Sequence, residues 1–216
     1  VAALDAAQVG ALRATQIGAL SATDVAEFSA TQAAAFTTTQ LRAFTATTVG
    51  DFTETQIAAL TTTQLQALNT SQLAVFDATQ LGALTTTQVA ALTATQIKGL
   101  NGTTVAALAE TQLAALTATQ VAALSSSGLS ALDATQIGAF TTTQVGALTR
   151  TQLAALPDTL LSALDATQVG ALNTTQVRAL TSTQLTALDA TDVAEFSTAQ
   201  LQALTTSQVQ SLTATN

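Results

Sequence analysis

The feature that most constrains this chain is an eight-residue repeat that runs through it without insertion or deletion. Residues 85–92, TTTQVAAL, are a typical copy, and we label their positions a to h. The chain starts at position e with Val1, and its 216 residues correspond to 27 repeats of eight. In an array with a short fixed period each unit contacts mainly its neighbours. We therefore predict a single uninterrupted array over residues 1–216.

Each repeat carries the residues that begin a helix. Position a is Asp, Ser, Thr or Asn except at Arg13, Ala109 and Pro157, and these side chains accept hydrogen bonds from the first turn. Position d is Gln in 20 of the 27 repeats, which completes a capping box with position a. Position h is always Leu or Phe, and position e is Val, Ile or Leu except at Ala33. Positions h and e are spaced as a hydrophobic staple around the cap.

The positions of the charged residues also indicate that each helix begins at position a. Ten of the 13 acidic residues stand at positions a, b or d, close to the expected helix start. Arg42, Lys98 and Arg178 stand at position f, late in the repeat. Acids are favourable near a helix N-terminus and bases near its C-terminus, so the charges agree with a helix that begins at a.

One long helix is excluded by geometry, because eight residues at about 100° each overshoot two turns by about 80°. We predict a helix of about two turns from b to g or h, followed by a break. A helix this short is unstable alone, so the predicted fold is an all-α solenoid of very short helices, one per repeat. Positions e and h fill its core, g allows close approach, f faces water, and c lies outside or between coils. Either three or four repeats make one coil.

A β-solenoid is the alternative fold, because Thr and Val are good strand formers. Against it, the apolar positions e, g and h do not alternate with a period of two. The pairing of a cap residue at a with Gln at d also has no equivalent in a strand. The helical prediction is therefore preferred.

The composition excludes several classes of function. Charged residues are 8% of the chain and its net charge is −8, which argues against nucleic-acid binding. No apolar run approaches the roughly 20 residues of a membrane span, so we predict no membrane insertion. The chain has no His and no Cys, so catalytic triads and thiolate or imidazole metal sites are impossible within it. We predict no enzyme activity, no catalytic residue and no cofactor.

A possible metal site is the one candidate for site chemistry. Asp24, Glu27 and Asp51 are acids in repeats that lack Gln at d, and the octapeptide ATDVAEFS occurs at both 22–29 and 190–197. Glu27 and Asp51 are 24 residues apart, so a coil of three repeats would stack them near Asp24 as candidate Ca²⁺ ligands. The competing interpretation, a duplicated variant repeat without a metal, is preferred.

Two side-chain rows invite a binding interpretation. Phe28, Phe36, Phe44 and Phe52 stand at position h, where Leu is usual, so we expect core packing and not a ligand pocket. Position c is Thr in 22 of the 27 repeats, and a regular row of Thr side chains could organise water as an ice-binding surface. The alternative is that these Thr residues only support the first helical turn.

The run LTTTQVAALTATQIKGL, at residues 84–100, resembles the Thr-Gln and Ala-Leu octapeptide arrays of large bacterial secreted or surface proteins described as hemagglutinin- or hemolysin-like. The resemblance extends over all 216 residues. It implies a secreted or surface structural segment and transfers no functional residue. The chain also lacks Cys, Met, Trp and Tyr, which suits an exposed extracellular location.

We therefore expect a structural protein, an extracellular fibre or filament subunit or a rigid spacer. Its expected partner is a second copy of itself, end to end, or further repeats of the same chain. The reason is that the first repeat has the usual pattern, with Val1 and Leu4 at the core positions e and h. No charged leader opens the sequence, so we expect a segment of something longer or export by a signal outside it. The alternative is a binding module, an ice-binding or adhesin segment, that uses the regular outer face.

Overall fold

A computed structural model describes residues 1–212, and within that range it contains 26 short helices and no strand. Each helix begins directly after a position a, so the predicted all-α solenoid is confirmed and the β-solenoid is wrong for the described residues. The last cap position, Thr213, lies outside them. The chain divides into two compact units, Val1–Leu108 (unit 1) and Ala109–Asn216 (unit 2), and each is described by itself.

The helices of both units differ little in length, and none has more than 6 residues. Unit 1 contains α1 (Ala6–Gly10), α2 (Ala14–Ile17), α3 (Ala22–Ala26), α4 (Ala30–Ala34), α5 (Thr38–Ala43), α6 (Ala46–Gly50), α7 (Glu54–Ala59), α8 (Thr62–Ala67), α9 (Thr70–Leu73), α10 (Ala78–Gly82), α11 (Thr86–Ala91), α12 (Ala94–Lys98) and α13 (Gly102–Ala106). Unit 2 contains α14 (Glu110–Ala114), α15 (Ala118–Ala123), α16 (Ser126–Ser130), α17 (Ala134–Gly138), α18 (Thr142–Gly146), α19 (Arg150–Ala154), α20 (Asp158–Leu161), α21 (Ala166–Gly170), α22 (Thr174–Val177), α23 (Ser182–Ala187), α24 (Ala190–Ala194), α25 (Thr198–Ala203) and α26 (Thr206–Ser211).

The helix starts have the predicted capping box. Thr85 is extended, with φ −69° and ψ 158°, and its Oγ1 accepts a hydrogen bond from the Gln88 N–H at 3.2 Å. In return, Gln88 Oε1 accepts from the Thr85 N–H at 2.7 Å. The N-cap side chain makes its bond in every described helix except α2, α14 and α20. The predicted role of positions a and d at the helix start is therefore confirmed.

The three exceptions follow from the cap residue. Arg13 and Ala109 offer no side-chain acceptor, but their N–H groups still donate to Gln Oε1 at 2.9 and 2.8 Å. Pro157 has no N–H to donate, and position d of the same repeat is Leu160 where most repeats have Gln. Gln is thus missing from a repeat in which its oxygen would have no donor.

Eight of the 26 described helices run from b to g, as expected from the sequence, and the others end one or two residues earlier. The helices contain 4 to 6 residues, and none in the described part is long and apolar enough to cross a membrane. The hydrogen bonding continues to position h, as the Leu60 N–H donates to the Ile57 carbonyl at 3.1 Å. Leu60 itself is extended, with φ −65° and ψ 136°, and leads into the next cap. No described residue has a positive φ, so the turn needs no glycine.

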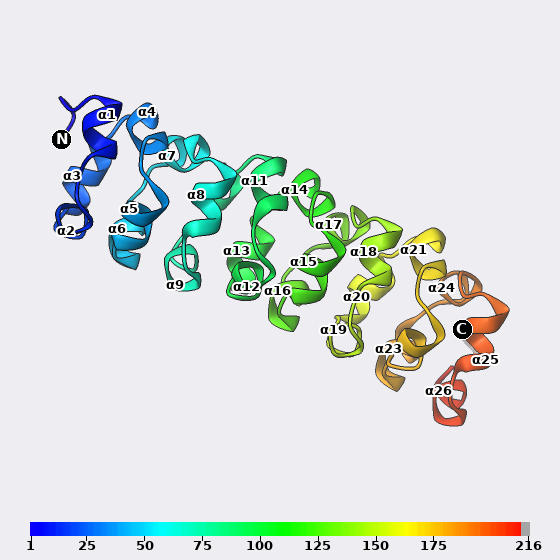
Figure 1. Cartoon of the computed structure of the whole chain (residues 1–216). Helices are drawn as coiled ribbons and strands as arrows, with labels where there is room; N and C mark the ends of the chain where they lie inside the picture. The colour runs from blue at the N-terminus through cyan, green and yellow to red at the C-terminus, as the bar shows by residue number, and fades with distance from the viewer. Residues whose placement is uncertain (213–216) are drawn as a thin grey trace. The chain divides into compact units, whose positions relative to one another are not determined.

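Three helices make one coil. The helices that pack most closely are three apart in the chain, such as α4 with α7 and α5 with α8 in unit 1, and α15 with α18 in unit 2 (Figure 1). Three repeats of eight place equivalent positions of successive coils 24 residues apart. Of the two coil sizes that the sequence allowed, three repeats is therefore the one found within each unit.

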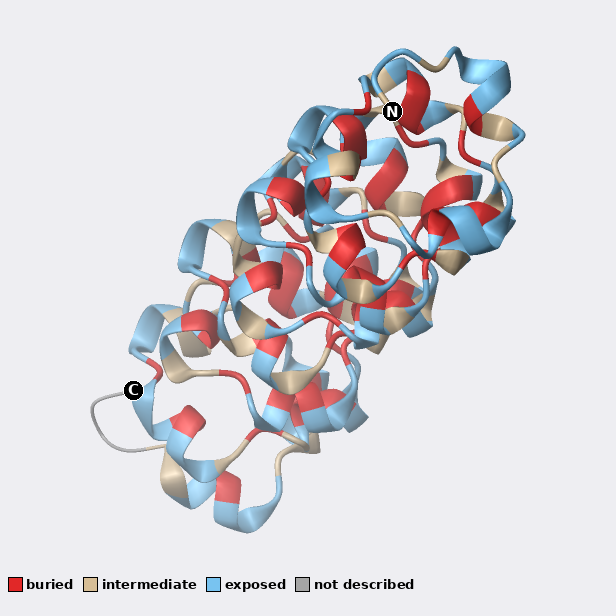
Figure 2. Cartoon of the chain, turned by 90° about the vertical axis from the view of Figure 1, so that its left-hand side faces the viewer, coloured by how far each residue is buried: buried red, intermediate tan, exposed pale blue. Residues whose placement is uncertain are grey.

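The core is formed by positions e and h, as predicted. In the repeat at 85–92, Val89 and Leu92 are 0% and 4% exposed. Burying one such side chain contributes about 1.5 to 3 kcal/mol, so the stacked coils supply the stability that single helices lack. Figure 2 shows the buried residues on the inner side of the helical turns and the exposed residues on the outer side.

The four neighbouring Phe residues of unit 1 belong to this core. Phe28 and Phe36 pack edge to face, with ring centroids 5.1 Å apart. The centroid distances are 5.2 Å from Phe36 to Phe44 and 5.3 Å from Phe44 to Phe52. All four side chains are buried, so the prediction of core packing is confirmed. The rings show that position h side chains of successive repeats meet inside the coil.

Candidate functional site at the contacts between coils

A column of buried glutamines is the main polar feature of both units. The side chains at position d are almost inaccessible in most coils, and Gln72 for example is 1% exposed. A buried amide costs free energy unless both its oxygen and its nitrogen have partners. Capping accounts only for the oxygen, so the nitrogen needs a second partner.

Gln56 shows how both ends of the amide are used. Its Oε1 accepts from the Thr53 N–H at 2.7 Å in the capping box. Its Nε2 donates to the carbonyl oxygens of Val25 at 2.8 Å and Phe28 at 2.6 Å, which lie 31 and 28 residues earlier. One side chain therefore begins its own helix and binds the end of a helix four repeats earlier.

The same contact recurs through both units. The carbonyl at h has no helical partner, because its residue is extended, and the Gln amide of the next coil supplies the missing donor. The Nε2 to carbonyl distance at 28 residues separation is 2.6 to 2.9 Å throughout. The glutamines with this bond include Gln32, Gln40, Gln56, Gln64, Gln72, Gln80, Gln88 and Gln96 in unit 1, and Gln144, Gln152, Gln168, Gln176, Gln184, Gln200 and Gln208 in unit 2.

A second set of contacts joins position f to the following coil. Gln66 Nε2 donates to the Ala91 carbonyl at 2.7 Å, and Arg42 Nε donates to the Ala67 carbonyl at 3.3 Å. The acceptor is at position g, 25 residues later. Other f side chains that make this bond are Ser130, to Ala155, and Thr186, to Ser211. Sequence reasoning placed f in water and missed this contact.

The g carbonyl oxygen also lies within contact distance of several glycines at position f. A Cβ at Gly18 would lie 3.4 Å from the Ala43 carbonyl oxygen, and one at Gly146 would lie 3.4 Å from that of Ala171. The residues at position f are small or can donate to this oxygen. The mixture of Gly, Ala, Gln and Arg at f is the signal in the sequence that could have revealed it.

The three candidate Ca²⁺ ligands have separate environments. Asp24 accepts from the Ser21 hydroxyl at 2.7 Å and the Ser21 N–H at 2.9 Å, and these bonds lower the pKa of its carboxyl group. Glu27 lies 3.4 Å from the amino group of Val1, and Asp51 is exposed at the end of α6. Within residues 1–212 no three His, Cys, Asp or Glu side chains are placed to hold a metal ion. The arrangement gives the Ca²⁺ hypothesis no support.

The second ATDVAEFS copy carries a perturbed acid, Glu195. Its pKa is raised, first by burial and then by the negative charges of Asp192, Asp165 and Asp189. Asp165 belongs to the preceding coil, three repeats earlier, so the acids meet because the coils stack. The ionised form of Glu195 is therefore unfavourable in the folded chain.

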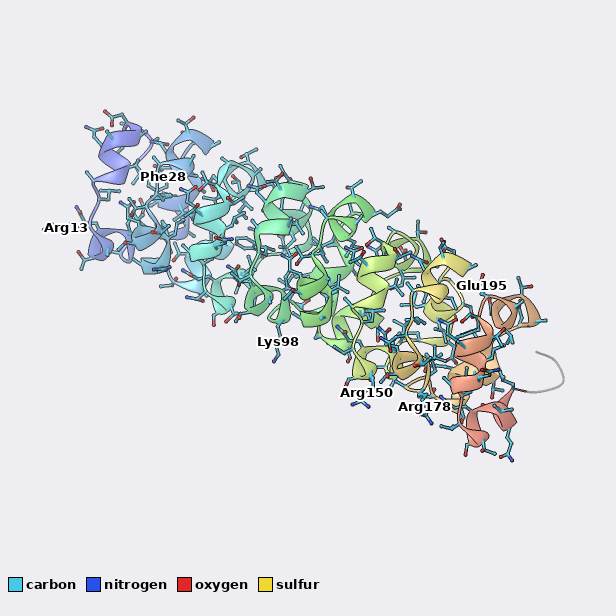
Figure 3. The ribbon with its side chains drawn as sticks, turned by 45° about the vertical axis from the view of Figure 1, so that its right-hand side comes forward. Arg13, Phe28, Lys98, Arg150, Arg178 and Glu195 are labelled. Carbon is cyan, nitrogen blue, oxygen red and sulfur yellow. The ribbon has the colours of Figure 1, made fainter. Side chains whose placement is uncertain are left out.

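Two arginine side chains line an open groove in unit 2. Its volume is about 790 Å³, and its lining includes Arg150 and Arg178 with the side chains of Thr151, Thr175 and Thr205. Both arginine side chains extend away from the ribbon of unit 2 in Figure 3. Among the described residues neither guanidinium group has a carboxylate partner. Arginine pairs bidentately with carboxylate or phosphate, so this surface can contact an anionic group.

The Thr row at position c is exposed in every described repeat, from position 7 to position 207. The side chains there take part in few bonds; one of them is Thr167 Oγ1, which donates to Asp165 Oδ1 at 2.6 Å. Of the two placements predicted for c, outside or between coils, the outside is found. Ice binding by this row stays a prediction.

One family model matches part of the chain. Residues 57–94 match the ALTTAQ repeat. The six letters of this repeat correspond to positions g to d, as in residues 83–88, where the chain has ALTTTQ. The match lies in unit 1, and it supports a repeat array. A search of curated proteins gave no match. The secreted bacterial setting implied by the resemblance stays a prediction.

Proposed function

We propose that this chain is a structural repeat array, an extracellular or cell-surface fibre subunit or rigid spacer that assembles end to end. The observation that carries the proposal is the bond from each buried Gln to the helix end of the preceding coil, as between Gln56 and Phe28. It joins each coil to the last by hydrogen bonds as well as by apolar contacts. Such repeated links favour an array that keeps its geometry, which a spacer requires.

We further propose that the chain is not an enzyme and binds no nucleic acid. It has no His or Cys, and the buried glutamines are engaged in capping and in contacts between coils. Its net charge of −8 opposes the phosphate backbone. Its repetitive sequence is suited to holding other groups apart, and an extracellular location agrees with the absence of Cys, Met, Trp and Tyr.

Removal of whole coils tests the spacer proposal. We expect the maximum dimension from small-angle X-ray scattering to fall in equal steps when one and then two coils of three repeats are deleted. Dimensions that do not change with coil number would rule out a rigid spacer. For the location, an antibody against the chain should label intact source cells as strongly as permeabilised cells, and labelling only after permeabilisation would rule out a surface role.

The groove of unit 2 favours a second candidate function, an adhesin-like module that binds an acidic polysaccharide. Arg150 and Arg178 would contact its carboxylates. The test is calorimetric titration with a polyuronate. Binding should be lost in the double variant Arg150→Gln, Arg178→Gln and kept in Lys98→Gln, which changes an exposed cation in unit 1. Equal binding by all three proteins, or no binding by the unchanged chain, would exclude this function.

A further inference from the structure

Three repeats have Asn at the cap position a, and each of them contains an acceptor motif for N-linked sugars. The motif is Asn-x-Ser or Asn-x-Thr, in which x is any residue except Pro. In this chain the hydroxyl residue of the motif stands at position c. The three pairs are Asn69 with Ser71, Asn101 with Thr103, and Asn173 with Thr175. Residues 1–212 contain no other Asn, so every Asn in the described part belongs to such a motif.

The capping bond of each Asn uses only the oxygen of its side-chain amide. Asn69 Oδ1 accepts from the Gln72 N–H at 2.9 Å, and the corresponding distances at Asn101 and Asn173 are 2.9 and 3.0 Å. All three residues are exposed, and within residues 1–212 no atom accepts a hydrogen bond from any of the three Nδ2 groups. An N-linked sugar is attached at Nδ2. The atom needed for attachment is therefore the one that the fold does not use.

The hydroxyl group of each motif is also available. Ser71, Thr103 and Thr175 are exposed, and among the described residues their hydroxyl groups form no hydrogen bond. In the repeat that begins at Asp165 the hydroxyl at position c is engaged, because Thr167 Oγ1 donates to Asp165 Oδ1 at 2.6 Å. The Asn repeats thus present both side chains of the motif to solvent.

We propose that Asn69, Asn101 and Asn173 are sites of N-linked glycosylation at the surfaces of units 1 and 2. In this reaction Nδ2 forms a bond to the anomeric carbon of a sugar, and this carbon loses its bond to the diphosphate of an activated sugar donor. One Nδ2 proton is released with the diphosphate. Oδ1 takes no part, so the modified side chain still caps its helix. The inference rests on the proposed extracellular location, because this motif is an acceptor in secreted proteins.

The repeat pattern itself creates the acceptor. Position c is Thr in 22 of the 27 repeats, so an Asn at position a is nearly always followed by the hydroxyl residue that the motif needs. Most repeats have Asp, Ser or Thr at position a, and these residues also cap a helix but have no amide nitrogen. The choice among cap residues therefore decides where a sugar can be attached, while the helix start stays the same.

Mass spectrometry of the chain isolated from its source cells tests the proposal. Cleavage after Lys and Arg places the three Asn in separate peptides, which are 43–98, 99–150 and 151–178. We expect each peptide to carry a glycan that peptide N-glycosidase removes, which leaves Asp in place of Asn. Three peptides with the unmodified mass would overturn the inference.

Variants in peptide 43–98, expressed in the same cells, separate the modification from folding. Asn69→Asp keeps the capping oxygen and removes Nδ2, while Ser71→Ala keeps Nδ2 and removes the hydroxyl group. Both should lose the glycan completely, and the control Ser71→Thr should keep it. Asp77→Asn should add a second glycan to the same peptide, because Thr79 already stands at position c. Circular dichroism should show the same helix content in all four variants.

Two further results would contradict the inference. A glycan that remains on peptide 43–98 of Asn69→Asp would place the modification at another residue. A single glycan on this peptide of Asp77→Asn would show that the repeat pattern does not create the acceptor. Labelling of intact cells by the antibody, together with three unmodified peptides, would refute the glycosylation and leave the surface location standing. Failure of this inference and failure of the proposed location are therefore distinguishable.

Discussion

Gln56 Nε2 donates to the carbonyl oxygen of Phe28 across 2.6 Å and 28 residues of sequence. This bond satisfies the end of one helix with the side chain that begins another. The same relationship joins Gln152 to Leu124 in unit 2 at 2.8 Å. Since each bond connects successive coils, changes at position d should affect the whole stack and not only one helix.

Gln88→Glu tests this double role. Glu keeps the oxygen that accepts from the Thr85 N–H, but it replaces the donor to the Ala58 and Leu60 carbonyls with a second, negatively charged oxygen. We expect a loss of about 1 to 3 kcal/mol or more in the free energy of unfolding, measured by chemical denaturation. The control is Gln8→Glu, whose amide nitrogen donates to no carbonyl among residues 1–212 and which should change stability little. Equal effects at both positions would show that Gln serves only as a cap.

A double-mutant cycle at Pro157 and Leu160 tests why one repeat dispenses with Gln. Pro157 already has the cap conformation, with φ −56° and ψ 145°. Leu160→Gln alone buries an amide oxygen with no donor, so we expect a lower thermal midpoint. Pro157→Thr supplies that donor, and the pair should therefore show a favourable coupling of about 1 kcal/mol or more. Additive effects would mean that the two residues are independent.

Deletions test whether the eight-residue repeats are equivalent structural units. Removal of residues 85–92 joins one h to the next a, and Gln96 then lies 28 residues after Leu60, another position h. We expect this variant to keep its helical circular dichroism and a cooperative thermal transition. Removal of residues 85–88 deletes one cap and its Gln, so we expect a lower midpoint and less helix. Comparable losses in the two variants would contradict the equivalence of the repeats.

Glu195 gives a prediction for pH. Because its pKa is raised in the folded chain, the folded state holds this proton more tightly than the unfolded state does. Stability from this group is therefore lost as pH rises through the raised value. We expect Glu195→Gln to raise the thermal midpoint at neutral pH, with the difference disappearing below the ordinary glutamate pKa of 4.5.

Glu54→Gln is the matched control for this measurement. Glu54 is exposed in the first turn of α7, where a negative charge is favourable. Its replacement should leave the midpoint unchanged or slightly lower. A midpoint of Glu195→Gln that stays below that of the unchanged chain at neutral pH would contradict the sign of the effect.

The helix starts and the core could be predicted from the sequence, because each depends on residues close together in one repeat. Thr85 caps Gln88 three residues away, and the core pattern of Val89 and Leu92 recurs in all repeats. The number of repeats per coil could not be predicted, because the repeats are so similar in sequence that nothing in a repeat indicates which other repeat it packs against. Gln88 already had a role as capping acceptor, and its bond to Leu60 becomes visible only when the coil size is known.

The contact between f and g was missed for a related reason. Gln66 stands on the outer surface, and its acceptor, the Ala91 carbonyl, is a backbone group, so only the restricted residue types at position f indicate the contact. Among the described residues, the Ca²⁺ candidates are not part of any group of three acids placed to hold a metal ion. Asp24 binds the hydroxyl and N–H of its own cap, Ser21, so its carboxylate is held at the start of α3.

The bond from Gln to the preceding helix end also bears on the order in which the chain can fold during synthesis. Its donor is always the later residue and its acceptor the earlier one, as Gln184 follows Leu156. During synthesis the acceptor carbonyls have therefore already left the ribosome when the glutamine that binds them emerges. Each new coil can therefore close on a coil that has already been synthesised, and the contacts from position f need only the 25 residues that follow.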